Sequence, residues 1–217
     1  MLFTGCSTSV YSPRGKPAPA GRWKTVFNGV ELARYTFREN VESDAPLAFL
    51  GRLERIKGVH NAIQIARAAG RQLIIAGNKV EGGDEPGYFD REIAPALEQG
   101  DVSYIGPVDD AQTDQLLGKC AALLMPIEWD EPFGIVMAEA LACGTPVIGY
   151  SRGSVPEVIR HGVTGFVVHD RDEAVAAVGR LDRVSRADAR TDCESRFSDV
   201  AIVSEYESLY EQMAHRS

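Results

Sequence analysis

Short apolar runs that alternate with helical patterns constrain the fold of this chain more than any other feature of its sequence. Several of the runs are continuously apolar instead of alternating, which is typical of a parallel sheet covered by helices on both faces. Strands are expected in these segments, in chain order: KTVF (24–27), PLAFLG (46–51), RQLIIAG (71–77), VSYIG (102–106), AALLMP (121–126), PVIGY (146–150) and GFVVH (165–169).

Helical patterns fill the intervals between these runs. They predict helices at Val59–Ala69, Tyr88–Glu98, Asp109–Leu117, Phe133–Ala142, Val155–Arg160 and Arg171–Leu181. We therefore expect an α/β fold, a doubly wound, Rossmann-like parallel sheet over residues 23–182. Ligands bind such sheets in the loops that follow the strands. The loops to search are GRLERIKG, AGNKVEGG, IGPVDD, MPIEWDEPFG and GYSRGSVPE.

The two ends of the chain differ from this pattern. Residues 1–22 are rich in Ser, Pro and Gly and predict an irregular leader or linker, with order beginning near Trp23. Residues 183–217 are charged at first and then predict a C-terminal helix over Asp199–His215 that docks elsewhere. Its apolar stripe consists of Ile202, Tyr206, Leu209 and Tyr210.

Composition excludes several classes of protein. A formal net charge of −8 argues against a general nucleic-acid binder, because affinity for the phosphate backbone needs clustered Lys and Arg. The 4 cysteines include no C-x-x-C pair, so they predict neither a disulfide framework nor a zinc site. The first residues, MLFTGCSTS, lack the basic region of a signal peptide, and no run approaches the ~20 apolar residues of a membrane span. We expect a cytoplasmic protein.

The segment EWDEPFGIVMAEALACG holds the first candidate site, because it turns from a strand into a helix. The backbone N–H groups of Phe133, Gly134 and Ile135 are expected to be unpaired first-turn donors, which suit an anion. Glu131 comes just before them. It can accept hydrogen bonds from sugar hydroxyls, or it can be a solvated carboxylate favoured by the helix dipole.

Glu139 stands alone inside the apolar part of the same helix. A carboxylate surrounded by apolar residues is costly unless it is paired or hydrogen-bonded, so it should have a dedicated partner. That partner can be a protein group such as Arg52 or a backbone amide. The alternative is a pair of hydroxyls on a bound polyol.

The loop GRLERIKG forms the second candidate site. Gly51 ends a strand, and Arg52 and Lys57 bracket the turn that precedes a helix. Two cations at the carboxyl end of a parallel strand suit a diphosphate, with Arg as a fork and Lys as a point charge. The alternative is that both cations are simply solvated.

The remaining polar candidates favour structural roles. No histidine has the spacing of a metal site or a catalytic triad, so a structural or surface role is expected for His60, His161, His169 and His215. Asp109 and Asp110 are expected to cap a helix. Trp129 can pack in the core or shield a sugar.

These motifs together resemble one enzyme family. GRLERIKG, followed much later by EPFGIVMAEALACGTPVI, is similar to the glycogen-synthase-like retaining glycosyltransferases of the GT-B fold, family 4, group 1, whose signature is E-x7-E. The resemblance extends over VFNGVELARY, IAGN, YIGPVDDAQTDQLLGKCAALLMP and GSVPEVIRHGVTGFVV. It covers most of the chain from Trp23 onward and implies the C-terminal, donor-binding half of a GT-B fold.

The resemblance implies roles for individual residues. Arg52 and Lys57 would hold the donor diphosphate and help the nucleoside diphosphate to leave. Glu131 would bind hydroxyls of the donor sugar and complete the catalytic set. Glu139 would bind the hydroxyls of the nucleotide ribose.

The other implied contacts are largely made by the main chain. The amides of Phe133, Gly134 and Ile135 would contact the sugar or the phosphates, and Gly51 would line the donor site. The loop that ends at Val108 would receive the base. The resemblance implies no metal and no cofactor.

The implied activity is a hexosyltransferase-like transfer of sugar, with retention, from a nucleotide-diphosphate sugar to an unknown acceptor. No N-terminal acceptor domain is recognisable, so we expect either that this chain is a fragment or truncated gene product of a protein that contains an acceptor domain, or that a separate subunit supplies the acceptor half. The first alternative is a catalytically silent nucleotide-sugar-binding module. The second is a nucleotide-sugar epimerase, which the E-x7-E block disfavours. The sequence does not specify the base, the sugar, the acceptor or the oligomeric state.

Overall fold

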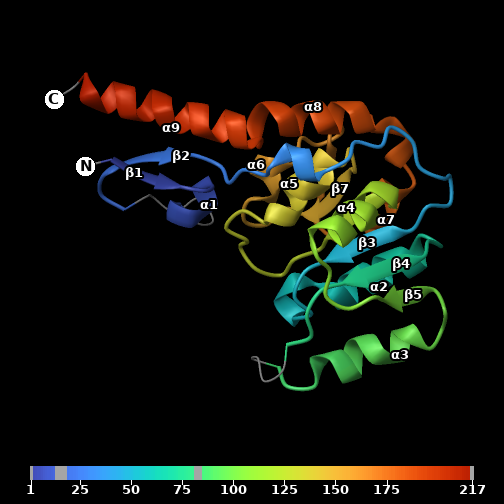
Figure 1. The fold of residues 1–217 in the computed structure, drawn as a ribbon. Helices are drawn as coiled ribbons and strands as arrows, with labels where there is room; N and C mark the ends of the chain where they lie inside the picture. Colours follow the sequence, from blue (N-terminus) through green and yellow to red (C-terminus); the bar gives the residue numbers. More distant parts are fainter. Residues whose placement is uncertain (1, 13–18, 81–84, 216–217) are drawn as a thin grey trace.

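The computed structural model describes residues 2–12, 19–80 and 85–215 of the 217-residue chain. Its main body is a six-stranded sheet with the strand order β5-β4-β3-β6-β7-β8, in which every neighbouring pair is parallel (Figure 1). The strand order reverses between β3 and β6, which confirms the predicted doubly wound topology. The strands are β3 (Leu47–Leu50), β4 (Leu73–Ala76), β5 (Val102–Tyr104), β6 (Ala122–Met125), β7 (Val147–Tyr150) and β8 (Gly165–Val168).

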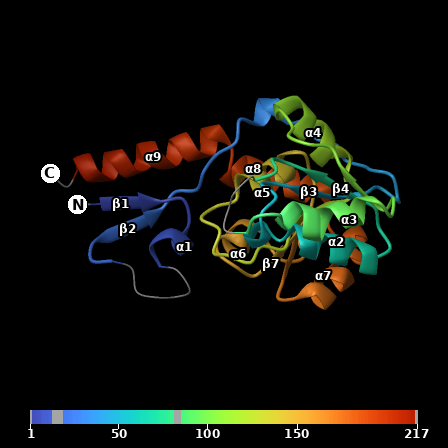
Figure 2. The same ribbon diagram turned by 90° about the horizontal axis from the view of Figure 1, so that it is seen from below.

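Helices cover both faces of this sheet (Figures 1 and 2). One layer comprises α2 (Val59–Ala68), the π-helical turn η4 (Phe89–Ile93) with α3 (Ala94–Leu97), and α7 (Arg171–Val178). The opposite layer comprises α4 (Asp110–Lys119), α5 (Ile135–Ala142), α6 (Val155–Val158) and α8 (Arg186–Arg196).

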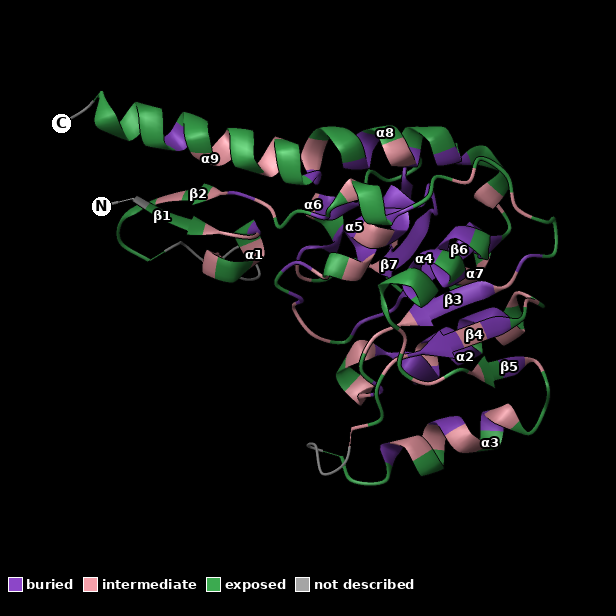
Figure 3. Ribbon diagram, viewed as in Figure 1, coloured by how far each residue is buried: buried purple, intermediate pink, exposed green. Residues whose placement is uncertain are grey.

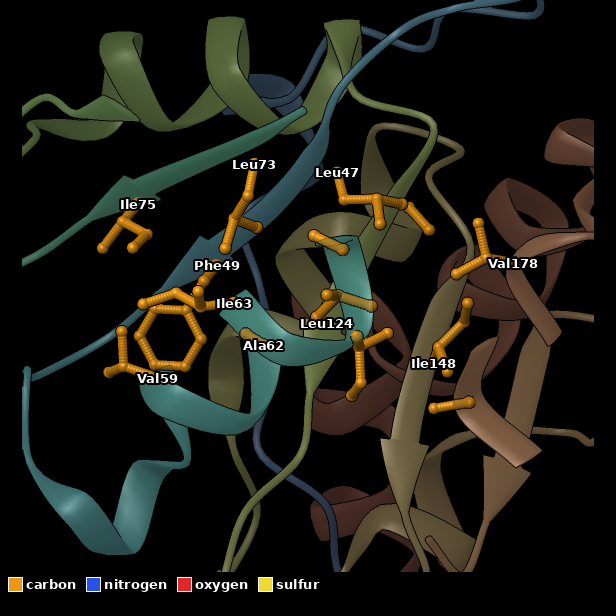
Figure 4. Packing of buried hydrophobic residues seen from close by; sticks show 14 of the residues in the cluster. Leu47, Phe49, Val59, Ala62, Ile63, Leu73, Ile75, Leu124, Ile148 and Val178 are labelled. Atoms are coloured by element: carbon orange, nitrogen blue, oxygen red, sulfur yellow. The ribbon is translucent and has the colours of Figure 1, made fainter. Parts of the chain in front are cut away.

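The core consists of two apolar clusters, one on each face of the sheet. Successive side chains of a strand point to opposite faces, so Leu47 and Phe49 belong to the cluster on the α2 side (Figure 4). Ala48 belongs to the cluster on the α5 side. Phe49 is 2% exposed, and burying a side chain of this size contributes about 1.5–3 kcal/mol. Strands β3, β4, β6, β7 and β8 are buried along almost their whole length, as the continuous apolar runs predict, whereas the edge strand β5 is partly exposed (Figure 3).

Two helix starts illustrate how local sequence sets the boundaries. Asp109 caps α4 with a capping box, in which its carboxylate accepts from the Gln112 amide and the Gln112 side chain accepts from the Asp109 amide. The helix expected from Phe133 begins instead at Ile135. Gly134, the N-cap residue, adopts a left-handed conformation with φ of 69°, so the regular helix begins only after it.

Residues 2–12 and 19–25 contain more secondary structure than their composition indicates. Strands β1 (Leu2–Gly5) and β2 (Arg22–Thr25), with α1 (Thr8–Tyr11) between them, form a separate two-stranded parallel sheet. Trp23 explains this order, because its ring stacks on Phe3 at 4.9 Å and on Tyr11 at 5.0 Å. The strand expected at 24–27 is therefore part of this small sheet and not of the main one. Residues 13–18 of the expected leader lie outside the described residues.

The C-terminal segment contains one helix more than expected. The turn η5 (Leu181–Arg183) leads into α8, and α9 (Asp199–Ala214) then runs beside the N-terminal sheet (Figures 1 and 2). Of the predicted stripe on α9, Leu209 is buried and Tyr210 is 66% exposed. The domain boundaries at residues 22 and 182 stay predictions. Among the described helices, none combines the length and the apolar character that crossing a membrane requires.

Candidate functional site

Two loops at the carboxyl edge of the sheet meet through a glycine. The 3-10 helix η3 (Arg55–Lys57) ends at Gly58, which has φ of 78°, and a Cβ there would lie 1.9 Å from the carbonyl oxygen of Pro126. Only glycine permits this approach, so Gly58 lets the loop after β3 rest against the loop after β6. These two strands are the neighbours at which the strand order reverses, the place where doubly wound sheets bind ligands.

Lys57 and Glu131, which were predicted separately, form an ion pair across this junction. The Nζ atom of Lys57 lies 2.5 Å from Oε2 of Glu131, and the side chains are 16% and 10% exposed. The same Oε2 accepts a hydrogen bond of 3.1 Å from Nε1 of Trp129. The ammonium also lies 4.6 Å from the centre of the Trp129 ring, within the range of a cation–π contact. Trp129 thus packs on the ion pair instead of serving only as core.

The loop after β7 is hydrogen-bonded to the backbone of the segment that carries Glu131. The amide of Ser154 donates to the carbonyl of Glu131 at 2.9 Å, and the Ser154 hydroxyl donates to the carbonyl of Phe133 at 2.8 Å. Gly153 has φ of 52°, and a Cβ there would lie 2.3 Å from the Glu131 amide nitrogen. This support fixes the segment from Glu131 to Phe133. The sequence signal for this support is the SRGSVPE loop, which follows a predicted strand, although the sequence pointed to no particular residue in it.

Arg52 occupies an exposed position in the loop that also carries Lys57. Its side chain is 56% exposed, and its Nη2 atom lies 3.2 Å from Oε2 of Glu54. Gly51 precedes it at the end of β3, where its amide donates to the carbonyl of Ala76 at 3.1 Å. The interpretation of Arg52 as a partner of Glu139 is wrong, since Arg52 pairs with Glu54.

Glu139 has its partner in Tyr35, which sequence reasoning did not single out. The Tyr35 hydroxyl donates to Oε1 of Glu139 at 3.0 Å, so the partner is neither Arg52 nor a backbone amide. Burial raises the pKa of Glu139, the hydrogen bond from Tyr35 partly opposes this, and the nearby Asp110 carboxylate adds to it. Tyr35 lies in the segment VFNGVELARY, which was noted only for its family resemblance.

The start of α5 presents backbone donors beside Glu131. No hydrogen bond within residues 2–12, 19–80 and 85–215 uses the amides of Phe133 or Gly134. The Phe133 side chain is 2% exposed and packs on Phe27 and Phe197, whereas Ile135 is 40% exposed. The predicted donors are therefore present, although the helix proper begins after the first two of them.

Val108 lies at some distance from the ion pair. It follows β5, which is two strands away from β3, so about 10 Å of sheet separate their ends. Val108 is half-buried and borders a hollow of about 530 Å³ beside α4, together with Ile105 and Gln112. The structure thus leaves it outside the Lys57–Glu131 cluster but at the same edge. Of the searched loop AGNKVEGG, residues 81–83 lie outside the described residues.

His60 links α2 to the loop that carries Glu131. Its Nδ1 lies 2.8 Å from the Tyr88 hydroxyl, and its Nε2 lies 3.1 Å from Oε1 of Glu128. Asn61 donates to the same Glu128 oxygen at 3.0 Å. These contacts give His60 the structural role that its sequence position predicted. They also brace the start of the loop that carries Glu131.

The N-terminal segment touches the same loop, which its composition did not indicate. The Ser9 hydroxyl donates to the Glu131 carbonyl at 3.3 Å, and the Ser7 hydroxyl donates to the Pro132 carbonyl. The amide of Thr8 donates to Oε2 of Glu157 at 2.8 Å. A hollow of about 480 Å³ lies between this segment and the loop after β7.

Metal binding has no candidate cluster in the part of the chain that the structure describes. There, no three or more His, Cys, Asp and Glu side chains are arranged to hold an ion. The metal independence implied by the sequence stays a prediction.

Known proteins share both the sequence pattern and the fold. Glycogen synthase of Mycobacterium tuberculosis is 34% identical over 156 residues, which are 69% of this chain and 36% of that protein. A crystal structure of AviGT4, a glycosyltransferase involved in avilamycin A biosynthesis, matches with a TM-score of 0.79 and 26% identity over 99% of this chain and 64% of that one. Anabaena HepE, solved with UDP-glucose, matches with a TM-score of 0.80 and 21% identity over 97% of this chain and 64% of that one.

The chain thus spans less than two thirds of the length of each of these proteins. A family model described as glycosyl transferases group 1 matches residues 36–196, which include the whole main sheet. The chain belongs to the group 1 glycosyltransferase family.

Proposed function

We propose that this chain binds a nucleotide-diphosphate sugar at the carboxyl edge of its sheet and forms the donor side of a retaining glycosyltransferase. The observation that carries the proposal is the buried pair of Lys57 and Glu131 beside the unpaired amides at the start of α5. A cation, a carboxylate and helix-terminal donors match the charges of a sugar diphosphate. HepE, which shares the fold, was solved with UDP-glucose.

Lys57 would act on the leaving group. Its ammonium has three donors, so it can keep Glu131 as a partner while it donates to a diphosphate oxygen. As the bond between the sugar C1 and the phosphate oxygen breaks, negative charge grows on the departing nucleoside diphosphate. Lys57, the exposed guanidinium of Arg52 and the amides of Phe133 and Gly134 would stabilise that charge.

The carboxylates would recognise hydroxyls. Glu131 faces Lys57 at the site where the donor sugar would lie, and Glu139 would take the ribose. Ile135 and Gly51 would line the donor, and the loop at Val108 would receive the base. The transferred group would be a hexose, with no metal or cofactor required, and the acceptor stays unassigned.

One alternative has specific support. Every proposed donor contact comes from the main sheet and its loops, and no described residue is assigned to an acceptor. A module that binds the nucleotide sugar without transferring it is therefore the second candidate, in which case an acceptor domain or subunit supplies the rest.

Binding of a nucleoside diphosphate tests both candidates. We expect UDP or ADP to bind the wild-type chain in excess EDTA, and Lys57→Gln to weaken this binding by about 10- to 100-fold, the value of a charged hydrogen bond. Isothermal titration calorimetry measures the affinity. Lys24→Gln is the matched control, since Lys24 lies on β2 of the N-terminal sheet and pairs with Glu205 of α9 at 3.4 Å. Equal affinity of K57Q and K24Q would remove Lys57 from the site, and a requirement for divalent metal would contradict the charge scheme.

A further inference from the structure

Tyr35 is held in place by three elements of the α5 layer. Its backbone amide donates to Leu32 in the turn η2 (Leu32–Arg34), and its carbonyl accepts from Nη1 of Arg190 on α8 at 3.0 Å. The same Arg190 atom donates to the carbonyl of Ala142 at the end of α5. The next residue, Thr36, donates its amide to Asp114 of α4 at 2.6 Å. The Tyr35 backbone is therefore fixed relative to the helix that carries Glu139.

The Tyr35 ring is buried, with 8% of the residue exposed, and only its hydroxyl meets a polar partner. That hydroxyl occupies Oε1 of Glu139. Within the described residues, Oε2 of Glu139 has no hydrogen bond to the protein. This atom is also not fully buried. One oxygen of the carboxylate is thus anchored, and the other remains in contact with solvent.

We infer that Tyr35 is a positioning residue that presents Glu139 to the vicinal hydroxyls of the nucleotide ribose. The inference rests on the proposed function and adds to it a residue outside the E-x7-E pair. A glutamate side chain has three rotatable bonds, and anchoring one carboxylate oxygen leaves the other oriented before the ligand arrives. Such preorganisation raises affinity because less conformational entropy is lost on binding.

The hydrogen bond also favours the charged form of Glu139, which accepts from hydroxyls. Burial raises the pKa of Glu139 above its ordinary value of 4.5, and the Tyr35 hydrogen bond pulls it back down. Burial and the Glu139 charge raise the pKa of Tyr35, so its hydroxyl remains a donor. Of the other charged groups around Glu139, Asp110 on α4 pairs with Arg34, and Arg190 on α8 pairs with Glu194.

The sign of the pH dependence follows. Ribose binding needs the carboxylate, so affinity should fall as the pH drops through the pKa of Glu139. Without the Tyr35 hydroxyl that pKa rises further, and the loss of affinity begins at a higher pH.

The test is Tyr35→Phe in the full chain, titrated by calorimetry between about pH 5 and pH 8 with the nucleoside diphosphate that binds wild type, and with its 2′,3′-dideoxy analogue. We expect the variant to bind the parent nucleotide about threefold to tenfold more weakly at neutral pH, the value of one hydrogen bond. The analogue should bind wild type and variant equally. Tyr210→Phe, on the exposed face of α9, is the matched control.

A double-mutant cycle covers the case in which Tyr35→Phe lowers the melting temperature. In a Glu139→Gln background, adding Y35F should cause no further loss of affinity. Equal losses for the nucleotide and its dideoxy analogue, or additive losses in the cycle, would assign Tyr35 a merely structural role and overturn the inference. A wild-type chain that binds none of UDP, ADP, GDP, CDP and dTDP would overturn the proposed function itself, and this inference with it.

Discussion

Replacing Glu131 with Gln should destabilise the fold measurably, because it leaves Lys57 without a carboxylate in a largely buried position. Removing one partner of a fully buried ion pair costs about 3–5 kcal/mol. The two side chains retain 16% and 10% exposure, and the Gln oxygen can still accept from Lys57 or Trp129. We therefore expect a loss of about 2–3 kcal/mol in the free energy of unfolding.

Lys57→Met is the second single variant of a double-mutant cycle on this ion pair. It should also destabilise, since Glu131 then keeps only the hydrogen bond from Trp129 among the side-chain contacts described here. The double variant should lose less than the sum of the two single variants, with a coupling energy of about 1–2 kcal/mol, because removing both charges leaves neither unpaired.

Urea unfolding followed by circular dichroism measures these losses, provided that the slope with denaturant is unchanged. Asp101→Asn is the matched control. It removes a carboxylate from the Arg67–Asp101 pair, whose side chains are 31% and 36% exposed, so it should cost about 0–1 kcal/mol. If E131Q lowers the free energy of unfolding no more than D101N does, the ion pair does not hold these loops together. The same conclusion follows if the losses of E131Q and K57M simply add in the double variant.

Two further predictions concern the fold and catalysis. Burial lowers the pKa of Arg186 to about 10, so it stays charged, and its guanidinium donates to the carbonyls of Gly118 and Cys120 at 3.1 Å. Arg186→Met leaves these carbonyls unpaired and should cost about 3 kcal/mol in urea unfolding, whereas the exposed Arg183→Met should cost under about 0.5. For catalysis, we expect residues 1–217 with a nucleotide sugar and simple acceptors to release nucleoside diphosphate only at the hydrolytic rate, because transfer requires an acceptor held in attack geometry and every contact proposed for this chain is to the donor. Robust acceptor-dependent release would contradict this.

The main sheet could be predicted because its signal is local. A strand buried on both faces must be apolar at every position, so runs such as those of β3, β4 and β6 predict parallel strands directly. The order of the strands in the sheet could not be predicted in this way, because the apolar run of one strand does not indicate which strands pair with it. The helix α8 shows the opposite case, since RADARTDCESR is too polar to read as a buried helix. It packs through Ala189 and Cys193, while Arg186 satisfies carbonyls of other elements.

The site residues could be named from the sequence more readily than their partners. Lys57 and Glu131 are 74 positions apart, and their contact depends on β3 and β6 being neighbours, which only the three-dimensional topology decides. Tyr35 and Glu139 are 104 positions apart, and a tyrosine in a connecting segment gives no sign that its hydroxyl will meet a carboxylate. Burial predicted that Glu139 needs a partner, but it could not identify that partner.

The pairing of these charges bears on how an acidic chain can bind a diphosphate. Lys57 is paired with Glu131 and Arg52 with Glu54, so an anion that binds either cation also approaches a carboxylate. A bare diphosphate has no hydrogen-bond donor for that carboxylate. A nucleotide sugar also brings hydroxyls, which can donate to Glu131 while Lys57 contacts both Glu131 and the phosphates, and to Glu139, whose second oxygen has no hydrogen bond among the described residues. The arrangement therefore favours a ligand that carries phosphates and vicinal hydroxyls together, which is the chemistry of the proposed donor.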